Sequence, residues 1–231
     1  PADRLDIVKR TIPAHGLPAR PVDVFEQQIA RIWLVTDTRQ AVRRDVVAFY
    51  NWDKDRAEIS ATPERIGLPP AKEYVGFDFW ANKFIPPFSG ALTATLPGTS
   101  SRIMAVRPVS ESPQLLSTSR HVTQGIVDVT DEKWDATKSQ LSATSKLVGN
   151  DPYELRIVVP SSEKSWRATG IQVSAEDVAA GVKASIKQDG PRIRAALSSP
   201  VSREVKWQVA FERAEVVRKL RKGLSFVISL K

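Results

Sequence analysis

The feature that most constrains the fold is a series of short stretches in which apolar and polar residues alternate. In ALTATLPG (91–98), Leu92, Ala94 and Leu96 fall on one face before a Pro-Gly turn signal. A period of two residues is typical of a β-strand with one buried face. Because such stretches recur about every ten residues with turns between them, they favour an antiparallel sandwich over βαβ units. The stretches lie at 45–52, 73–80, 91–98, 101–108, 113–119, 153–160, 166–174 and 204–212.

One tight hairpin is predicted inside the second series. Residues 182–186 alternate into Asp189–Gly190, and residues 193–197 alternate out of it. Asp-Gly between two alternating runs is a strong local signal for a two-residue turn. We therefore predict an all-β protein with two tandem antiparallel β-sandwiches, the first over 33–127 and the second, Ig-like, over 128–214.

The two ends of the chain have a different texture. Residues 4–12 carry apolar residues at nearly helical spacing, and a second short helix is predicted to end near Trp33. Residues 1–32 are thus expected to form a helical segment and linker. The basic tail, 215–231, is expected to hold a short helix stopped by Gly223 and then a terminal strand.

Composition excludes several kinds of site. Cysteine is absent and the only histidines are His15 and His121. We therefore expect no disulfide, no metal site and no cofactor. The net charge is +8, but five of those charges fall within 203–231 and the rest are mixed with acidic residues, so nucleic acid is not expected as a partner.

No membrane association is expected either, because no apolar run approaches the roughly 20 residues that span a bilayer. A basic helix in the tail would suit a membrane surface, but a solvated helix face is the simpler interpretation. The first residues do not resemble a signal peptide, and the chain begins inside a helix-like segment. We therefore expect that further sequence precedes residue 1, and the compartment stays open.

The stretch SPQLLSTSRHVTQG (112–125) holds the main candidates for chemistry. His121 lies near the hydroxyls of Ser117, Thr118 and Ser119, yet neighbouring residues of a strand point to opposite faces, so proximity in sequence does not make a catalytic pair. No nucleophile elbow, phosphate-binding glycine loop or evident carboxylate pair is present. We predict no catalytic residue, and assign Arg120, His121 and Gln124 to an inter-domain polar cluster.

Tryptophan is the other cue, since a sugar ring stacks well on an exposed indole. Trp207 fits the alternation of a strand and is predicted to be buried. Other tryptophans lie near strand ends, where an aromatic side chain usually fills an interface between elements. Four of them are candidate carbohydrate contacts: Trp52, Trp80, Trp134 and Trp166.

Three stretches together resemble a known family: VVAFYNWDKDRAEI, EYVGFDFWANKFIPPFSGALTATLPGTSSRIMAVRP and PQLLSTSRHVTQG. They are similar to the C-terminal β-domain of melibiase-type, α-galactosidase-like glycoside hydrolases. The opening segment, with the R-P-x-D pattern of Arg20, Pro21 and Asp23, resembles the end of the (β/α)8 barrel of those enzymes. The resemblance covers residues 1–135, and it departs from the family at Ser100–Ser101, where many relatives have a cysteine.

The resemblance implies a function without catalysis in this chain. In that family the catalytic aspartates lie at the ends of barrel strands, which would precede residue 1. The chain is then a non-catalytic accessory region that packs on and stabilises the catalytic barrel of the same protein. An independent carbohydrate-binding module is the alternative, and a hydrolytic site at His121 is a third hypothesis.

Overall fold

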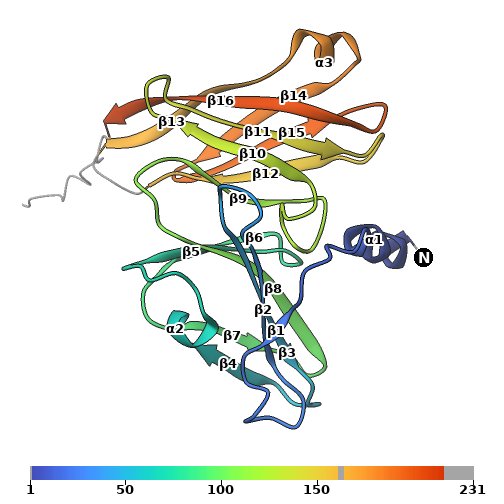
Figure 1. The fold of residues 1–231 in the computed structure, drawn as a ribbon, viewed down its shortest axis with the longest axis vertical. Coiled ribbons are helices and arrows are strands. Elements are labelled where there is room, and N and C mark those ends of the chain that lie inside the picture. The colour runs from blue at the N-terminus through green and yellow to red at the C-terminus, as the bar shows by residue number, and fades with distance from the viewer. Residues whose placement is uncertain (1, 161–163, 216–231) are drawn as a thin grey trace, which may run out of the picture.

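The computed structural model describes residues 2–160 and 164–215, which form a helix and two β lobes (Figure 1). Helix α1 (Ala2–Thr11) opens the chain. Below it in Figure 1 lies the first lobe, made by strands β1 to β8, and above it lies the second lobe, made by β9 to β16. Every strand pair in both lobes is antiparallel.

The first lobe is a large sheet packed on a small one. The six-stranded sheet runs in the order β1 (Arg20–Pro21), β2 (Ile32–Asp37), β3 (Arg44–Asn51), β8 (Ser100–Pro108), β5 (Tyr74–Asp78) and β6 (Lys83–Phe88). Strands β4 (Ala57–Ala61) and β7 (Leu92–Leu96) pair separately, and the short helix α2 (Pro63–Ile66) follows β4. Alternation places Val47 and Phe49 of β3 in the core against Ile59, Leu92 and their neighbours.

The second lobe is a sandwich of two four-stranded sheets. One sheet has the order β10 (Val129–Asp135), β11 (Gln140–Leu147), β16 (Arg203–Glu215) and β13 (Lys164–Val173). The other has the order β14 (Lys183–Asp189), β15 (Arg192–Ser198), β12 (Tyr153–Val158) and β9 (Gln114–Thr118), and helix α3 (Ala175–Ala179) joins β13 to β14. Both sheets bury alternate residues in one core, with Trp207, Leu155 and Ile193 among the most buried.

The interior of this lobe also holds a chain of polar side chains. The indole N–H of Trp207 donates to Ser145 Oγ at 2.9 Å, and Ser145 Oγ lies 3.0 Å from the hydroxyl of Tyr153. That hydroxyl donates to Asp128 Oδ2 at 2.7 Å. Buried polar groups are costly unless they are paired. These hydrogen bonds therefore fix the position of Asp128, which precedes β10, against the core of the second lobe.

The two lobes are joined by apolar and ionic contacts. Val75 and Phe77 of the first lobe pack on Leu116 and Val158 of the second. The guanidinium of Arg156, a residue only 5% exposed, lies 4.2 Å from the centroid of the Phe77 ring. A cation over a desolvated ring face is attractive, and these contacts hold the lobes together.

The fold class predicted from the alternation is confirmed: the protein is all-β, with antiparallel sheets in sandwiches and a short N-terminal helix. The helix predicted at 4–12 is present as α1, and β14 and β15 form the predicted hairpin. Its two turn residues are Gly190, at φ 53°, and Pro191 rather than the predicted Asp189–Gly190, because Asp189 still pairs with Arg192. Trp207 is 2% exposed, as predicted for a buried position.

Three details differ from the sequence-based expectations. The second helix, predicted to end near Trp33, is wrong: β2 begins at Ile32, and the Asp23 carboxylate accepts the backbone N–H groups of Arg31 and Ile32. The segment 113–119, expected in the first sandwich, forms β9 and pairs with β12 in the second lobe. The weakly patterned residues after Gly125 contain β10 and β11.

Two expectations concern other parts of the chain. The helix and strand predicted for the tail at 215–231 lie outside the described residues, except for Glu215 at the end of β16. Among the described residues, no helix has the length and apolar character needed to cross a bilayer.

Candidate functional site

The outer face of the six-stranded sheet is apolar and only partly covered. Strand alternation puts Val47 and Phe49 into the core, so Val46, Ala48 and Tyr50 point to the opposite side of β3. There they line a shallow hollow of about 380 Å³. We call this surface the open face, and it comprises Trp33, Val35, Val46, Ala48, Tyr50, Trp52 and Ile103, with His15, Ala19, Val122 and Thr123 at its edge.

Trp52 is the most exposed aromatic side chain of the open face. It is 46% exposed, and its ring stacks on Tyr50 with centroids 5.0 Å apart and planes 4° from parallel. The indole N–H groups of Trp52 and Trp33 both donate to the carbonyl of Ala30, at 3.0 and 3.1 Å. Burial raises the pKa of the Tyr50 phenol, so Tyr50 stays neutral. The aromatic side chains are therefore held rigidly in place.

Helix α1 also exposes apolar residues. Leu5, Ile7 and Val8 are each at least 49% exposed, and Ile12 just beyond the helix is 55% exposed. What holds the helix is polar: Arg10 forms a bidentate pair with Asp151, at 2.8 and 3.1 Å. The helix is thus attached by its polar side, and its apolar side chains lack a partner within the described part of the chain.

The residues predicted to form an inter-domain polar cluster lie at this attachment and at the lobe joint. The guanidinium of Arg120 donates to the carbonyl of Lys9. The backbone N–H of Val122 donates to the carbonyl of Arg10. Gln124 bridges the lobes, because its Nε2 donates to the Ile103 carbonyl of β8 at 3.3 Å and its Oε1 accepts from Ser117 of β9 at 2.7 Å.

His121 is buried and is not paired with a nucleophile. Its Nδ1 lies 2.7 Å from Thr123 Oγ1 and accepts the Thr123 backbone N–H, whereas the hydroxyl of Ser117 is bonded to Gln124. Burial lowers the pKa of His121, so the ring is neutral near pH 7. With 1% exposure, the His121 side chain is enclosed by the protein.

Three buried or partly buried carboxylates are bonded to three different partners. Asp78 pairs with Arg102, Asp151 pairs with Arg10, and Asp128 accepts from Tyr153. Burial raises the pKa of Asp128. Among residues 2–160 and 164–215, no group of three or more His, Cys, Asp or Glu side chains is arranged to hold a metal ion.

The four tryptophans proposed as carbohydrate contacts divide into two pairs. Trp166 is 6% exposed and packs edge-on against Trp134 inside the second lobe, with centroids 5.1 Å apart. Trp166 belongs to the core of the sandwich, and Trp134 is partly buried against it. Trp52 and Trp80 are 46% and 40% exposed.

A buried cluster of three charged side chains lies where the two lobes meet, and no motif in the sequence indicates it. Glu132 of β10 accepts from Arg44 of β3 at 2.6 Å and from Arg107 of β8 at 3.0 Å. Its side chain is 5% exposed, and those of the two arginines are 7% and 16% exposed. Burial alone would raise the pKa of Glu132, but Arg107 and Arg44 outweigh it and hold that pKa below its ordinary value. We call these three residues the joint triad.

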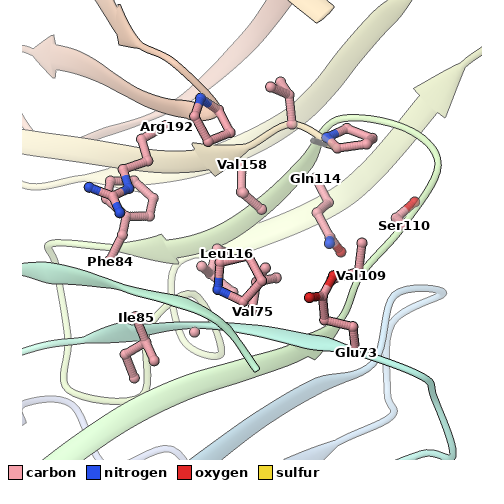
Figure 2. Close-up of a pocket in the computed structure, with 15 residues that line it drawn as sticks. Glu73, Val75, Phe84, Ile85, Val109, Ser110, Gln114, Leu116, Val158 and Arg192 are labelled. Atoms are coloured by element: carbon pink, nitrogen blue, oxygen red, sulfur yellow. The ribbon is translucent and has the colours of Figure 1, made fainter. Parts of the chain in front are cut away.

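A small cavity also lies between the two lobes (Figure 2). Its volume is about 120 Å³, and its walls come from β5 and β6 of the first lobe and from β9 and β12 of the second. Most of its lining is apolar, including Val75, Ile85, Leu116 and Val158. In Figure 2, Arg192 and Phe84 lie at one side, and Glu73, Gln114 and Ser110 lie toward the other.

No protein-family model matches the chain, and no curated protein matches it. Among solved structures, the chain is similar to α-galactosidase I from Mortierella vinacea, with 18% sequence identity and a TM-score of 0.31. The match covers 39% of this chain and 23% of that chain, so it spans less than a quarter of the enzyme. A likeness at this level does not establish the family.

Proposed function

We propose that this chain is a non-catalytic accessory region of an α-galactosidase-like glycoside hydrolase, and that it packs on the catalytic (β/α)8 barrel through the open face and α1. The observation that carries the proposal is the six-stranded sheet, which is apolar on both faces. One face is covered by β4, β7 and α2, and the other presents Trp33, Val35 and Tyr50 to a shallow hollow.

A sheet with two apolar faces is normal when elements cover both sides of it. Burying apolar surface contributes roughly 25 cal/mol per Å², so a third layer on the open face would be stabilising. The outer ring of a (β/α)8 barrel consists of helices, which can supply such a layer. The exposed Leu5, Ile7 and Val8 of α1 give a second apolar surface in need of the same cover.

The state of the candidate catalytic groups also supports an accessory role. The only histidine in the polar cluster is buried and bonded to Thr123, and the buried carboxylates are bonded to separate partners. The resemblance of residues 1–135 to the region that follows the barrel in melibiase-type enzymes supplies the partner.

The test uses a substitution that is destabilising only if the open face is covered by another part of the protein. Ala48→Arg places a long charged side chain on the open face, and Thr93→Arg places the same group on the exposed side of β7. In the purified chain, both variants are expected to unfold within about 1 kcal/mol of the parent. In the longer polypeptide that includes the residues before Pro1, Ala48→Arg should lower the barrel's melting temperature and its α-galactosidase activity, while Thr93→Arg should not.

Two results would overturn the proposal. One is a reading frame upstream of Pro1 that lacks a (β/α)8 pattern. The other is an equal effect of the two variants in the longer polypeptide. Hydrogen exchange gives an independent check, because the backbone around Ala48 and Tyr50 should be better protected in the longer polypeptide than in the purified chain.

A carbohydrate-binding module remains the second candidate, favoured by the exposed and rigidly held ring of Trp52. It predicts that the purified chain is retained on a galactomannan gel and that Trp52→Ala abolishes retention. The accessory-region proposal predicts no retention, so the two candidates are separated by one chromatographic experiment. Phe25→Ala is the matched control, since Phe25 is a fully exposed aromatic residue outside the open face and is not a candidate contact.

A further inference from the structure

We propose that the cavity between the lobes is a binding site for a small aromatic carboxylate, with the ring inside the cavity and the carboxylate on Arg192. This proposal is independent of the proposed accessory function, because the cavity and the open face use different residues.

The cavity has the size and lining for one aromatic ring. Its volume of about 120 Å³ is close to that of an engineered protein cavity of about 150 Å³ that binds benzene. Val75, Val158 and Leu116 belong to the inter-lobe apolar cluster, so the walls are fixed by the packing of the lobes. Gly76 keeps the floor open, since a Cβ there would lie 2.9 Å from Ile85 Cδ1. A mostly apolar hollow with a few polar groups is the usual form of a small-molecule site.

The charge beside the cavity points to an anion. Arg192 and Phe84 each line both the cavity and an adjoining open groove of about 940 Å³. In the described part of the chain, Arg192 has no hydrogen-bond or ion-pair partner within bonding distance. The neighbouring Arg194 differs, because it is bound to Glu154 and to Asn82. Arg192 is therefore the guanidinium available for a ligand.

The groove adds further positive charge. Lys187 lies directly across from Arg194 in the β14–β15 pair, and like charges opposite each other destabilise a sheet. Lys83, from the start of β6, lines the same groove. Two carboxylates, Glu154 and Asp189, also line it: Glu154 is already bound by Arg194, and Asp189 lies across from Arg192 in the β14–β15 pair. A planar guanidinium such as that of Arg192 binds a carboxylate with two parallel hydrogen bonds.

The other end of the cavity distinguishes among aromatic acids. Glu73 lines it there, and Gln114 Nε2 donates to the carbonyl of Pro108, which leaves its side-chain oxygen as an acceptor. Both groups can accept a hydrogen bond from a hydroxyl on the ring position opposite the carboxylate (Figure 2). The cavity is therefore expected to prefer 4-hydroxybenzoate to benzoate, and benzoate to the neutral benzyl alcohol.

The experiment is an NMR titration of the 15N-labelled chain with these three probes, and with acetate as an anion that has no ring. Benzoate is expected to shift the resonances of Val75, Leu116 and Val158, and acetate is not. Arg192→Gln should weaken benzoate binding about tenfold and leave benzyl alcohol unchanged, because only the charged probe loses a partner. Glu73→Ala should remove the preference for 4-hydroxybenzoate.

A blocking variant tests the cavity itself. Val109 lines it and is 37% exposed, so Val109→Trp can fill the opening without entering the core, and it should abolish binding of all ring probes. Arg65→Gln is the matched control, since it removes an exposed guanidinium of the first lobe that pairs with Glu26. The proposal is refuted if no ring probe binds to the folded chain, or if Arg192→Gln affects benzoate no more than Arg65→Gln does.

Discussion

The joint triad makes one measurable prediction about how the lobes are held together. Glu132→Gln keeps the size of the side chain but removes the charge that Arg44 and Arg107 share. The carboxylate also accepts the backbone N–H of Leu115, so one side chain connects β3, β8, β9 and β10. After the substitution, the two guanidinium groups remain largely buried without the carboxylate that contacts both of them.

The expected cost follows from the burial. Removing one partner of a buried ion pair usually costs about 3–5 kcal/mol, because the remaining charge keeps its desolvation penalty. Arg107 is 16% exposed and can relax toward water, and the glutamine amide can still accept a hydrogen bond, so the lower end applies. We expect a loss of about 3 kcal/mol, equivalent to about 6–12 °C in melting temperature for a chain of this length.

The assay is urea unfolding followed by tryptophan fluorescence and far-ultraviolet circular dichroism. The matched control is Glu26→Gln, because Glu26 pairs with Arg65 on the surface, with side chains 56% and 42% exposed. Surface pairs contribute between 0 and about 1 kcal/mol. If Glu132→Gln costs no more than Glu26→Gln, the triad does not hold the lobes together as argued here.

Two more predictions concern His121 and a glycine. Burial gives His121 a lower pKa in the folded chain than in the unfolded chain, so the unfolded chain binds the proton more tightly, and the free energy of unfolding should fall as the pH drops below about 6.5. His121→Gln should flatten that slope in unfolding curves measured from pH 7.5 to 5, and an unchanged slope would contradict the interpretation. Gly98→Ala should destabilise the chain by about 2 kcal/mol or more in thermal unfolding, because its Cβ would lie 1.8 Å from the carbonyl oxygen of Lys54. Gly170→Ala, with open space around it, should be neutral to slightly stabilising, and equal effects of the two changes would refute the steric argument.

Strand alternation carried the fold prediction because it reports burial directly. In β7, and over residues 205–211 of β16, every second residue is apolar and faces a core, so both strands could be located from sequence. Strand β10, with the sequence VTDEKWD, could not, because its inward positions include Glu132. A carboxylate is normally taken as a solvent-facing residue, and nothing in the sequence shows that two arginines from distant strands meet it.

The contacts of His121 and the exposure of the tryptophans could be predicted only in part from the sequence. Ser117 lies in β9 and bonds Gln124, whereas His121 lies in the loop after β9 and contacts Thr123, and strand alternation gives no information about that loop. The sequence did not separate Trp52 from Trp166, because both lie near strand ends and exposure depends on which face the neighbouring sheet covers. The open face depends on the same tertiary fact, since alternation alone does not show whether the second side of β3 is covered.

The place of β9 has a practical consequence for dissecting the protein. A fragment cut at residue 128, the boundary that alternation suggests, would lack this strand and leave the backbone of β12 unpaired along one edge, beside the apolar core residues Leu155 and Ile157. Unprotected edges of this kind promote intermolecular pairing, so such a fragment should precipitate during purification. Starting the fragment near residue 109 retains the strand and should yield a monodisperse domain.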